Sequence, residues 1–433
     1  MKRLLRTVAV VATISAPVAV DAAKAESVYI PLLTYRTGGY ADSGTPVANG
    51  MTDYLRYVNS KGGVNGVTIE FEECETGYKT DVGVECYERL KSKHPLVFNP
   101  YSTGITNAII PKTPTDKIPV LSMGYGLTAA ADGRVFPYVF NFPTTYWSQA
   151  SAFIRYIEQQ EGGAAKLKGK KIGLIHLDHP YGKEPIPTLE VLAAKYGYKL
   201  KLYPVPPKTM QDQRSTWEKI EDDDLDWLLM WGWGAMNPTA MKGAVDVDFP
   251  MDRFIGVWWS GNESDVRDQG AKATGYLAGE FHGVGTDFPL LQALKKNIAG
   301  KNGSITPDAM VGETLYNRGV FNAVVVVEAI RAAQAKYGNK AINAEEMRWG
   351  LENLDIGEAR LKELGLAGFS HPIKVSCADH EGNGPVYIKR WDGTGWQKHS
   401  DWISPMRDVV RPLIEAEAKK LAMERKLKVR SCS

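Results

Sequence analysis

The chain has 433 residues, which is enough for two or three domains at about 150 residues each. Hydrophobic residues make up 44% of it, charged residues 24%, and no run beyond the first twenty residues is apolar for the ~18 residues that a membrane span needs, so disordered, fibrous and multi-span membrane proteins are excluded. The formal net charge is +2 and the only basic stretch is the tail at residues 419–430, so we expect no nucleic-acid partner.

The first residues predict a secretory signal peptide. Three basic residues precede an apolar run over residues 7–20, and the small residues Ala23 and Ala25 stand where signal peptidase reads the chain, so we expect cleavage after Ala25. The alternative, a single N-terminal membrane anchor, is disfavoured because the run is short and Pro17 interrupts it. The first cysteine, Cys74, is too far from the leader for a lipid anchor. We therefore expect a freely soluble exported protein.

The rest of the chain alternates short β-rich runs with amphipathic runs of ten or more residues, which is typical of repeated βα units and a parallel sheet. One set of strands is predicted at residues 28–33, 68–74, 96–101, 119–123 and 138–142. Helices are predicted between the first four of these, at residues 47–60, 80–91 and 105–115. A second set of strands is predicted at residues 171–177, 199–205, 227–231, 254–258 and 275–281. The pattern predicts an α/β fold of two doubly wound Rossmann-like lobes in tandem.

After residue 281 the pattern returns to helices, at residues 290–298, 313–336 and 345–353. None of them leads into a new parallel strand, so we expect them to pack on an existing lobe, with the chain crossing between the lobes more than once. The turn-rich residues 379–384 predict an antiparallel hairpin between residues 371–378 and 385–391, followed by a third short strand. The last 25 residues predict a solvated basic helix.

Four cysteines in an exported protein favour disulfides. Cys74 ends a predicted strand and Cys86 lies in the helix that follows, so this pair closes a short loop with ease, and we expect the disulfide Cys74–Cys86. A second bond, Cys377–Cys432, follows only by elimination, and the alternative is that both cysteines are free. The spacing fits no zinc site, so we expect no metal.

Aromatic residues gather at strand ends, where an open parallel sheet binds its ligand. The second-lobe strands end in Trp231, Trp233, Trp258 and Trp259. The matching edge of the first lobe carries Tyr35, Arg36, Tyr101, Ser102, Thr103 and Tyr125. Rings next to glycines suit a pocket for a flat or apolar solute. The alternative is that the tryptophans only pack between helices and sheet.

Ser102 and Thr103, together with Thr106, stand where a predicted strand leads into a helix. Their hydroxyls and the free N–H groups of the first helical turn would suit a carboxylate. Plain helix capping needs the same residue types and remains open as the alternative.

Several sequence patterns that are typical of enzymes are incomplete in this chain. Gly124, Gly126 and Ala129 follow a strand with nucleotide-binding spacing, but the acidic residue expected about 20 positions later is absent, so we expect no dinucleotide cofactor. His176 and His179 lack further ligands nearby for a metal site. The seven histidines show no spacing that identifies a general base, so we expect no enzyme.

Four segments, residues 30–34, 58–66, 99–104 and 178–182, resemble the branched-chain amino acid type of periplasmic solute-binding protein of ABC transporters, also called type I periplasmic binding proteins. The resemblance covers nearly the whole mature chain. It implies a periplasmic protein whose two lobes, joined by three crossovers, close on a small solute and deliver it to inner-membrane permease subunits. It also implies the lobe boundaries, with the first lobe at residues 26–143 plus 283–370 and the second at residues 144–282 plus 371–433.

The resemblance implies ligand contacts at particular positions. In the first lobe these are Tyr35, Arg36, Ser102, Thr103, Tyr125 and Thr128, and in the second Tyr181, Trp231, Trp233 and Trp259. Trp259 stands where amino-acid binders carry the carboxylate that pairs with the α-ammonium group. A buried ammonium without a counter-charge costs several kcal/mol, so an apolar or aromatic carboxylate is expected rather than an amino acid. Glu263 lies a few residues further and keeps a branched-chain or aromatic amino acid open, and a sensory receptor of the same fold is a further alternative.

Overall fold

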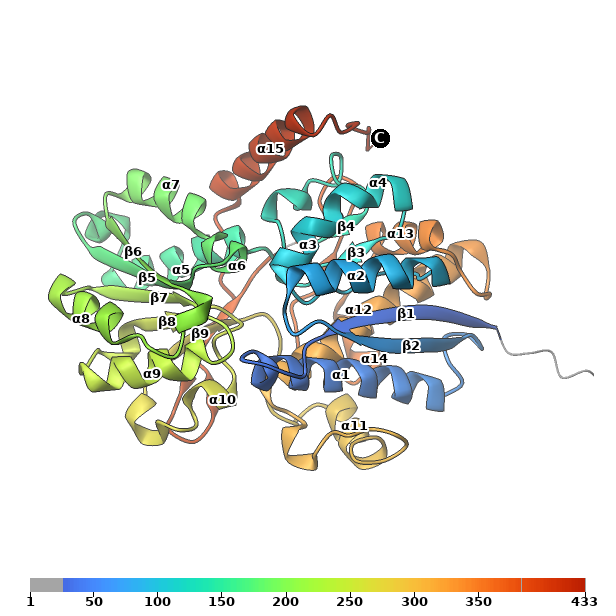
Figure 1. Ribbon diagram of the computed structural model, residues 1–433, viewed down its shortest axis with the longest axis horizontal. Helices are drawn as coiled ribbons and strands as arrows, with labels where there is room; N and C mark the ends of the chain where they lie inside the picture. The colour runs from blue at the N-terminus through green and yellow to red at the C-terminus, as the bar shows by residue number, and fades with distance from the viewer. Residues whose placement is uncertain (1–25, 383, 433) are drawn as a thin grey trace, which may run out of the picture.

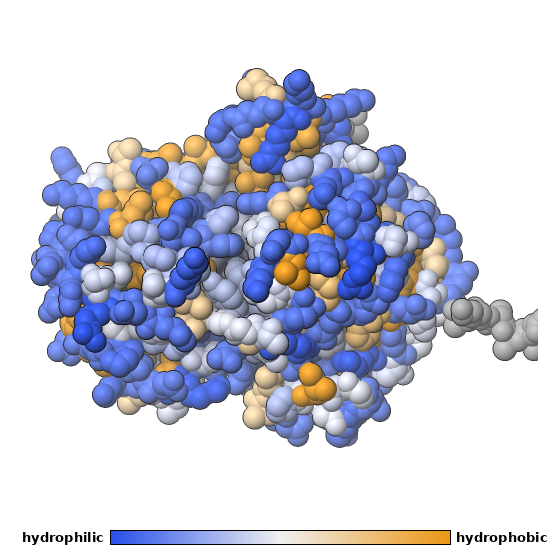
Figure 2. All heavy atoms as spheres, viewed as in Figure 1, coloured by the Kyte–Doolittle hydropathy of each residue, from blue (hydrophilic) through white to orange (hydrophobic). Residues whose placement is uncertain are grey.

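The computed structural model describes residues 26–382 and 384–432, so the predicted signal peptide lies outside the described residues. Two α/β lobes lie side by side, with β1 to β4 in one and β5 to β9 in the other (Figure 1). The face shown in Figure 2 is mostly hydrophilic, with hydrophobic residues in small separate groups. Within the described part of the chain, no helix has the length and apolar character needed to span a membrane.

The first lobe is built on short parallel strands. β1 (Ser27–Thr34) pairs with β2 (Thr68–Glu75), and β3 (Val120–Leu121) pairs with β4 (Val139–Phe140). Residues 96–101, which the sequence predicts as a strand, join these pairs through single bridges from Asn99 to Leu32 and from Phe98 to Val120. The helices that follow these strands are α1 (Ala41–Ser60), α2 (Thr80–Leu90), α3 (Thr103–Ile109) and α4 (Thr113–Asp116). The carboxyl ends of the strands therefore meet at one edge.

The second lobe carries a seven-stranded sheet in the order β13-β12-β9-β8-β7-β5-β6. Its parallel strands are β5 (Lys171–Leu177), β6 (Lys199–Val205), β7 (Trp227–Trp231), β8 (Phe254–Gly256) and β9 (Leu277–Glu280). Its helices are α5 (Tyr146–Glu161), α6 (Pro180–Lys183), α7 (Ile186–Tyr196), α8 (Arg214–Asp223), α9 (Met236–Asp246) and α10 (Glu263–Val266). Every residue of β7 is buried, as expected of a parallel strand covered by helices on both faces.

The helices predicted after residue 281 pack on the first lobe, as expected. They are α11 (Pro289–Asn297), α12 (Thr314–Tyr337) and α13 (Ala344–Glu352), with α14 (Glu358–Glu363) after them. α12 packs closely along α1: a Cβ at Gly50 would lie 2.0 Å from the Tyr316 carbonyl oxygen, and one at Gly319 would lie 2.0 Å from that of Val47. Glycine at both positions lets the two helix backbones touch, which fixes α12 to the first lobe.

The predicted hairpin between residues 371–378 and 385–391 is wrong. β11 (Ile373–Lys374) pairs instead with β10 (Asp355–Ile356), while β12 (Tyr387–Trp391) pairs antiparallel with β9. The intervening turn is held away from β12 because Asp379 bridges to Asp132 in the first lobe. The third short strand is confirmed as β13 (Trp396–Lys398), next to β12. The lobe boundaries stay a prediction, and these contacts favour a third crossover nearer residue 384 than residue 370.

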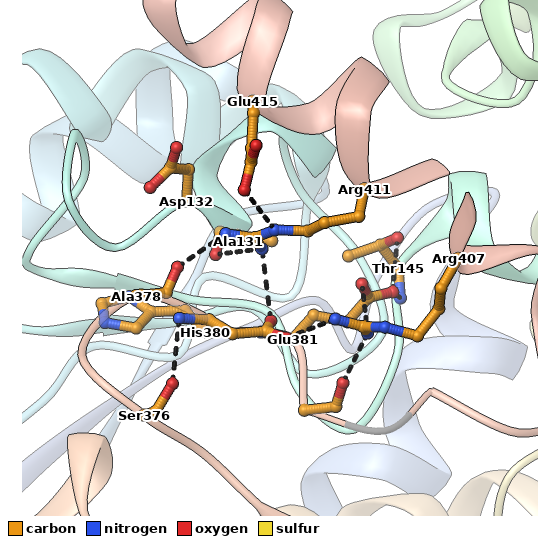
Figure 3. Close-up of polar contacts among 12 residues, drawn as sticks. Ala131, Asp132, Thr145, Ser376, Ala378, His380, Glu381, Arg407, Arg411 and Glu415 are labelled. Atoms are coloured by element: carbon orange, nitrogen blue, oxygen red, sulfur yellow. Dashed lines mark hydrogen bonds and ion pairs between the residues drawn. The ribbon is translucent and has the colours of Figure 1, made fainter. Parts of the chain in front are cut away.

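The C-terminal helix α15 (Arg407–Glu424) is not simply solvated. Val410, Ile414, Ala418 and Leu421, spaced three or four residues apart, form a buried stripe against the 3-10 turn at Thr128–Ala131 and against α5. The basic residues at the start of α15 point toward the loop at residues 376–381 (Figure 3).

Polar contacts and a disulfide fix both ends of α15. Arg411 Nη2 donates to the Ala378 carbonyl at 2.8 Å (Figure 3). Arg407 Nη2 pairs with Asp379 at 2.5 Å. Beyond the helix, Cys432 is bonded to Cys377. The expected disulfide Cys74–Cys86 is also present, so among the residues that the structure describes no cysteine is free.

Candidate functional site

A small closed cavity lies between the lobes, at the carboxyl ends of both sets of strands. It is lined by six tyrosines, two tryptophans, one serine and one threonine: Tyr35, Tyr78, Tyr101, Ser102, Thr103, Tyr125, Tyr146, Tyr181, Trp233 and Trp259. The free space inside, about 20 Å³, is close to what one water molecule needs. The lobes are therefore closed on a space that a solute larger than water enters only if they separate or the rings turn.

The first-lobe wall is held by hydrogen bonds between strand-end loops. The Tyr101 N–H donates to the Tyr125 hydroxyl at 2.7 Å, and the Gly126 N–H donates to Thr103 Oγ1 at 3.1 Å. Ser102 is the N-cap of α3, since its Oγ accepts from the Ile105 N–H at 3.4 Å. Capping is thus the role of Ser102 and not of Thr103 or Thr106, which lie within α3, and the Ser102 side chain lines the cavity as well.

The second-lobe wall comes from four separate elements. Tyr146 begins α5, Tyr181 lies in α6, Trp233 follows β7, and Trp259 follows β8. The Tyr181 hydroxyl donates to the Gly232 carbonyl at 2.8 Å, which fixes its ring against the turn that carries Trp233.

Two consecutive indoles connect the lobes beside the cavity. Trp258 Nε1 and Trp259 Nε1 donate to one carbonyl oxygen of the first lobe, that of Gly124, at 2.8 and 3.0 Å. Gly124 has φ of +69°, and a Cβ there would lie 2.9 Å from Phe281 Cε1. Glycine is therefore required for this loop to reach both indoles.

Four residues predicted as ligand contacts do not line the cavity. Arg36 turns away from it, and its Nε pairs with Glu73 at 2.6 Å. Thr128 instead makes a contact between the lobes, where its Oγ1 donates to Glu184 at 2.7 Å.

The other two are tryptophans that support the wall from behind. Trp231 is buried against Phe153 in the second lobe. Trp258 stacks on the Tyr146 ring, with centroids 5.6 Å apart, and holds Gly124. Trp231 and Trp258 therefore pack within the protein, which is the alternative that the sequence left open for the tryptophans.

Tyr78, Tyr101 and Tyr146 line the cavity without having been predicted as contacts. Tyr78 follows β2, and Tyr101 directly precedes Ser102, so the strand-end argument gave a signal for both. Tyr146 stands at a helix start between the two sets of strands, where that argument gives none.

No charged side chain lines the cavity among the described residues. Burial raises the pKa of Tyr35, Tyr101 and Tyr181 well above the usual 10, so their hydroxyls stay protonated and polar. Trp233 Nε1 is buried and makes no hydrogen bond of ordinary geometry within the described chain, although it faces the Tyr35 hydroxyl closely enough to affect the pKa of that group. The site thus offers neutral donors and electron-rich rings.

A group of buried charges lies directly behind Trp259. Arg318, on α12, stands with its guanidinium carbon 4.6 Å from the Trp259 ring centroid and pairs with Glu280 at the end of β9, at 2.6 Å. Lys389 pairs with the other oxygen of Glu280 at 3.1 Å. Burial by itself would raise the pKa of Glu280, but Arg318 lowers it below the usual value. We call Glu280, Arg318 and Lys389 the hinge charge cluster, because it joins the first-lobe helix α12 to two strands of the second lobe.

Glu263, the acid that left an amino-acid ligand open, does not reach the cavity. Its carboxylate accepts from the Thr314 N–H at 2.9 Å and from Thr314 Oγ1 at 3.2 Å. It lines a separate groove, together with Glu313 and Trp396.

The candidate metal ligands have other partners. His179 Nδ1 caps α6 by accepting from the Tyr181 N–H at 3.3 Å, and His176 Nδ1 lies 3.1 Å from the Leu177 carbonyl oxygen. Over residues 26–382 and 384–432, no three His, Cys, Asp or Glu side chains are grouped as metal ligands.

Comparison with known proteins places this geometry among binding proteins. A family model described as periplasmic binding protein matches residues 27–396. A structure from the Pseudomonas fluorescens group, described as an ABC transporter permease, is 42% identical with a TM-score of 0.86, covering 94% of this chain and 100% of that one. No curated protein matches.

Two more distant structures share the fold. A branched-chain amino acid ABC transporter protein from Thermus thermophilus with bound valine is 21% identical, with a TM-score of 0.77 and coverage of 90% and 99%. A solute-binding protein from R. palustris in complex with benzoate is 14% identical, with a TM-score of 0.69 and coverage of 88% and 97%.

Proposed function

The chain belongs to the periplasmic binding protein family, and from this premise we propose that it captures a small carboxylate with an apolar or aromatic body for an ABC importer. The observation that carries the proposal is the cavity between the lobes, whose walls are rings and hydroxyls from both sides. Closure on a solute requires only that the closed state bind it more tightly than the open state.

We propose that the carboxylate docks on the first-lobe turn. Ser102 and Thr103 line the cavity at the start of α3, where the first helical N–H groups have no partner within the helix. The buried Trp233 N–H supplies a further donor from the opposite lobe. Arg36, which the sequence suggested for this role, is committed to Glu73.

The second lobe then covers the body of the solute with Tyr181, Trp233 and Trp259. Burying roughly 200 Å² of solute surface at about 25 cal/mol/Å² supplies about 5 kcal/mol. Charge-assisted hydrogen bonds of about 1.5 to 3 kcal/mol each make a micromolar Kd reachable after the cost of association.

A standard α-amino acid fits less well. Its ammonium group would need a buried acceptor with negative charge, and no acidic side chain in the described chain lines the cavity. Glu263 is bonded to Thr314 in a different groove. The sensory receptor remains a second candidate because the same closure would serve it, and binding of the closed protein to the importer's membrane subunits separates the two.

A thermal-shift screen of the exported chain tests the ligand class. We expect alkyl and aryl carboxylates to raise Tm and leucine, valine and phenylalanine to leave it unchanged. Stabilisation by the amino acids alone would contradict the proposal. Solute titration followed by tryptophan fluorescence tests the site: Trp259→Ala should weaken binding at least tenfold, while the control Trp349→Ala, on α13 and outside the cavity, should not.

A further inference from the structure

The composition of the cavity wall points to a more specific ligand. All eight rings belong to tyrosine or tryptophan, and neither phenylalanine nor an aliphatic residue lines the cavity within the described chain. Pockets for purely apolar groups are normally lined by aliphatic side chains as well. The faces of tyrosine and tryptophan rings carry negative electrostatic potential, and a set of such rings is the usual enclosure for a cation that carries methyl groups.

The charge balance of the site leads in the same direction. A carboxylate bound at Ser102 and Thr103 would be buried among neutral groups, because Arg36 turns away to Glu73. Burying an uncompensated charge is costly even when hydrogen bonds are made. A solute that carries its own positive charge would leave the closed cavity neutral overall.

The type of positive charge is restricted by the acceptors available. A primary ammonium has three N–H donors to satisfy. No acidic side chain of the described chain lines the cavity, and three of its hydroxyl oxygens already accept from backbone donors: Tyr125 from the Tyr101 N–H, Thr103 from the Gly126 N–H and Ser102 from the Ile105 N–H. A quaternary ammonium has no N–H and needs only ring faces.

Building on the function proposed above, we propose that the solute is a zwitterion in which a carboxylate is joined by a short linker to a quaternary ammonium group. The carboxylate lies on Ser102 and Thr103, and the methylated ammonium is enclosed by the tyrosine and tryptophan rings. Trp259 already accepts one cation in this way, since the Arg318 guanidinium carbon lies 4.6 Å from its ring centroid. That guanidinium is paired through Nη2 with Glu280 at 2.6 Å, on the side of the indole away from the cavity, and shares this carboxylate with Lys389.

Two probes of the same shape test the charge. Trimethylammonioacetate and tert-butylacetate differ only in the nitrogen or carbon atom that carries the three methyl groups. The hydrophobic effect favours tert-butylacetate, so only an interaction with the positive charge reverses the order. By isothermal titration of the exported chain, we expect trimethylammonioacetate to bind at least tenfold more tightly.

Ring variants identify the source of the preference. The preference is the Kd of tert-butylacetate divided by the Kd of trimethylammonioacetate. We expect this ratio to fall from wild type to Trp233→Phe and further to Trp233→Leu, because tryptophan binds cations best and leucine offers no ring. Both values come from the same variant, so a general loss of folded protein cancels in the ratio. Tyr78→Phe and Tyr78→Leu provide an independent series on the first lobe, should Trp233→Leu fail to fold.

The outcomes separate this inference from the proposed function. Equal or tighter binding of tert-butylacetate would overturn the quaternary ammonium and leave carboxylate capture standing. The same holds if neither probe binds while other carboxylates in the thermal-shift screen do. If no carboxylate of any kind stabilises the protein, the proposed function fails and the inference fails with it.

Discussion

The cavity and the hinge charge cluster lie on either side of Trp259 and are built in opposite ways. The cluster buries three formal charges that pair with one another, at 2.6 Å for Arg318 with Glu280 and 3.1 Å for Lys389 with Glu280. The cavity is lined by no charged side chain of the described chain, and its Trp233 N–H makes no hydrogen bond of ordinary geometry there. The comparison teaches that the buried charges pair through one carboxylate and serve to join the lobes, whereas the cavity wall is neutral and its hydroxyls are held by hydrogen bonds within each lobe.

The largest expected effect comes from breaking the cluster. Arg318→Met removes the charged hydrogen bond of Arg318 to Glu280 but leaves the pair of Glu280 with Lys389, so we expect the free energy of unfolding to fall by about 1.5 to 3 kcal/mol in urea denaturation. Arg331→Met on the same helix is the matched control, because Arg331 is 37% exposed and its pair with Glu328 is worth less than about 1 kcal/mol. A loss no larger than that of the control would show that the cluster does not stabilise the closed arrangement.

Glu184 also lies between the lobes but, unlike Glu280, has no cationic partner in the described part of the chain. The Glu184 side chain, which accepts from Thr128 across the lobes at 2.7 Å, has a pKa that burial raises to about 7. The folded state thus holds this proton more tightly than the unfolded chain, where a glutamate titrates near 4.3. The stability that the protonated group contributes is present at low pH and is lost as the pH rises through about 7.

Glu184→Gln removes this titration. We expect the variant to become more stable relative to wild type as the pH rises from about 4.3 to about 7, by no more than about 1.4 kcal/mol per pH unit, with no further change above that range, in urea denaturation. Asp265, whose pKa burial also raises to about 7, titrates in both proteins and cancels. Glu190→Gln, on the exposed side of α7, is the matched control for the substitution itself. Parallel curves for Glu184→Gln and wild type would contradict the prediction.

The smallest of these effects concerns how the lobes stay closed. In Gly124→Ala the new Cβ would lie 2.9 Å from Phe281 Cε1 and 3.3 Å from Trp258 Nε1, so we expect the best solute of the thermal-shift screen to dissociate about tenfold faster in stopped-flow fluorescence. Gly38→Ala is the control, since Gly38 has a similar φ of +80° but no atom within 4 Å of the added Cβ. Equal rates in the two variants would assign the effect to backbone strain alone.

The strand pattern was sufficient to predict the two lobes, because alternating βα units leave few topologies open. It failed for residues 371–378, which have the pattern of a hairpin strand. They pair with β10 instead, and the turn that follows bridges from Asp379 to Asp132, which is distant in sequence. No local propensity reports either contact. The buried face of α15 was readable, since Val410, Ile414 and Ala418 recur at helical spacing within a segment that looks basic overall.

The sequence was sufficient to place the site at the strand ends, but not to tell which side chains there face the cavity. Trp231 and Trp233 flank the same glycine, yet only Trp233 lines the cavity, because Trp231 is still within β7 and turns into the lobe. Arg36 could have been placed from the sequence: β1 and β2 were expected as neighbouring strands, and Glu73 and Glu75 stand at the end of β2. Tyr146 could not, because its position depends on where the chain enters the second lobe.

The placement of α15 offers a way to follow solute exchange. The helix contacts the turn at Thr128–Ala131 on one lobe and α5 on the other, and the Cys377–Cys432 bond tethers the segment that follows it. Separation of the lobes therefore has to disturb at least one of these contacts. An environment-sensitive dye at the exposed Glu424, near the end of the helix, would then report each opening event from outside the cavity, without altering any residue that meets the solute.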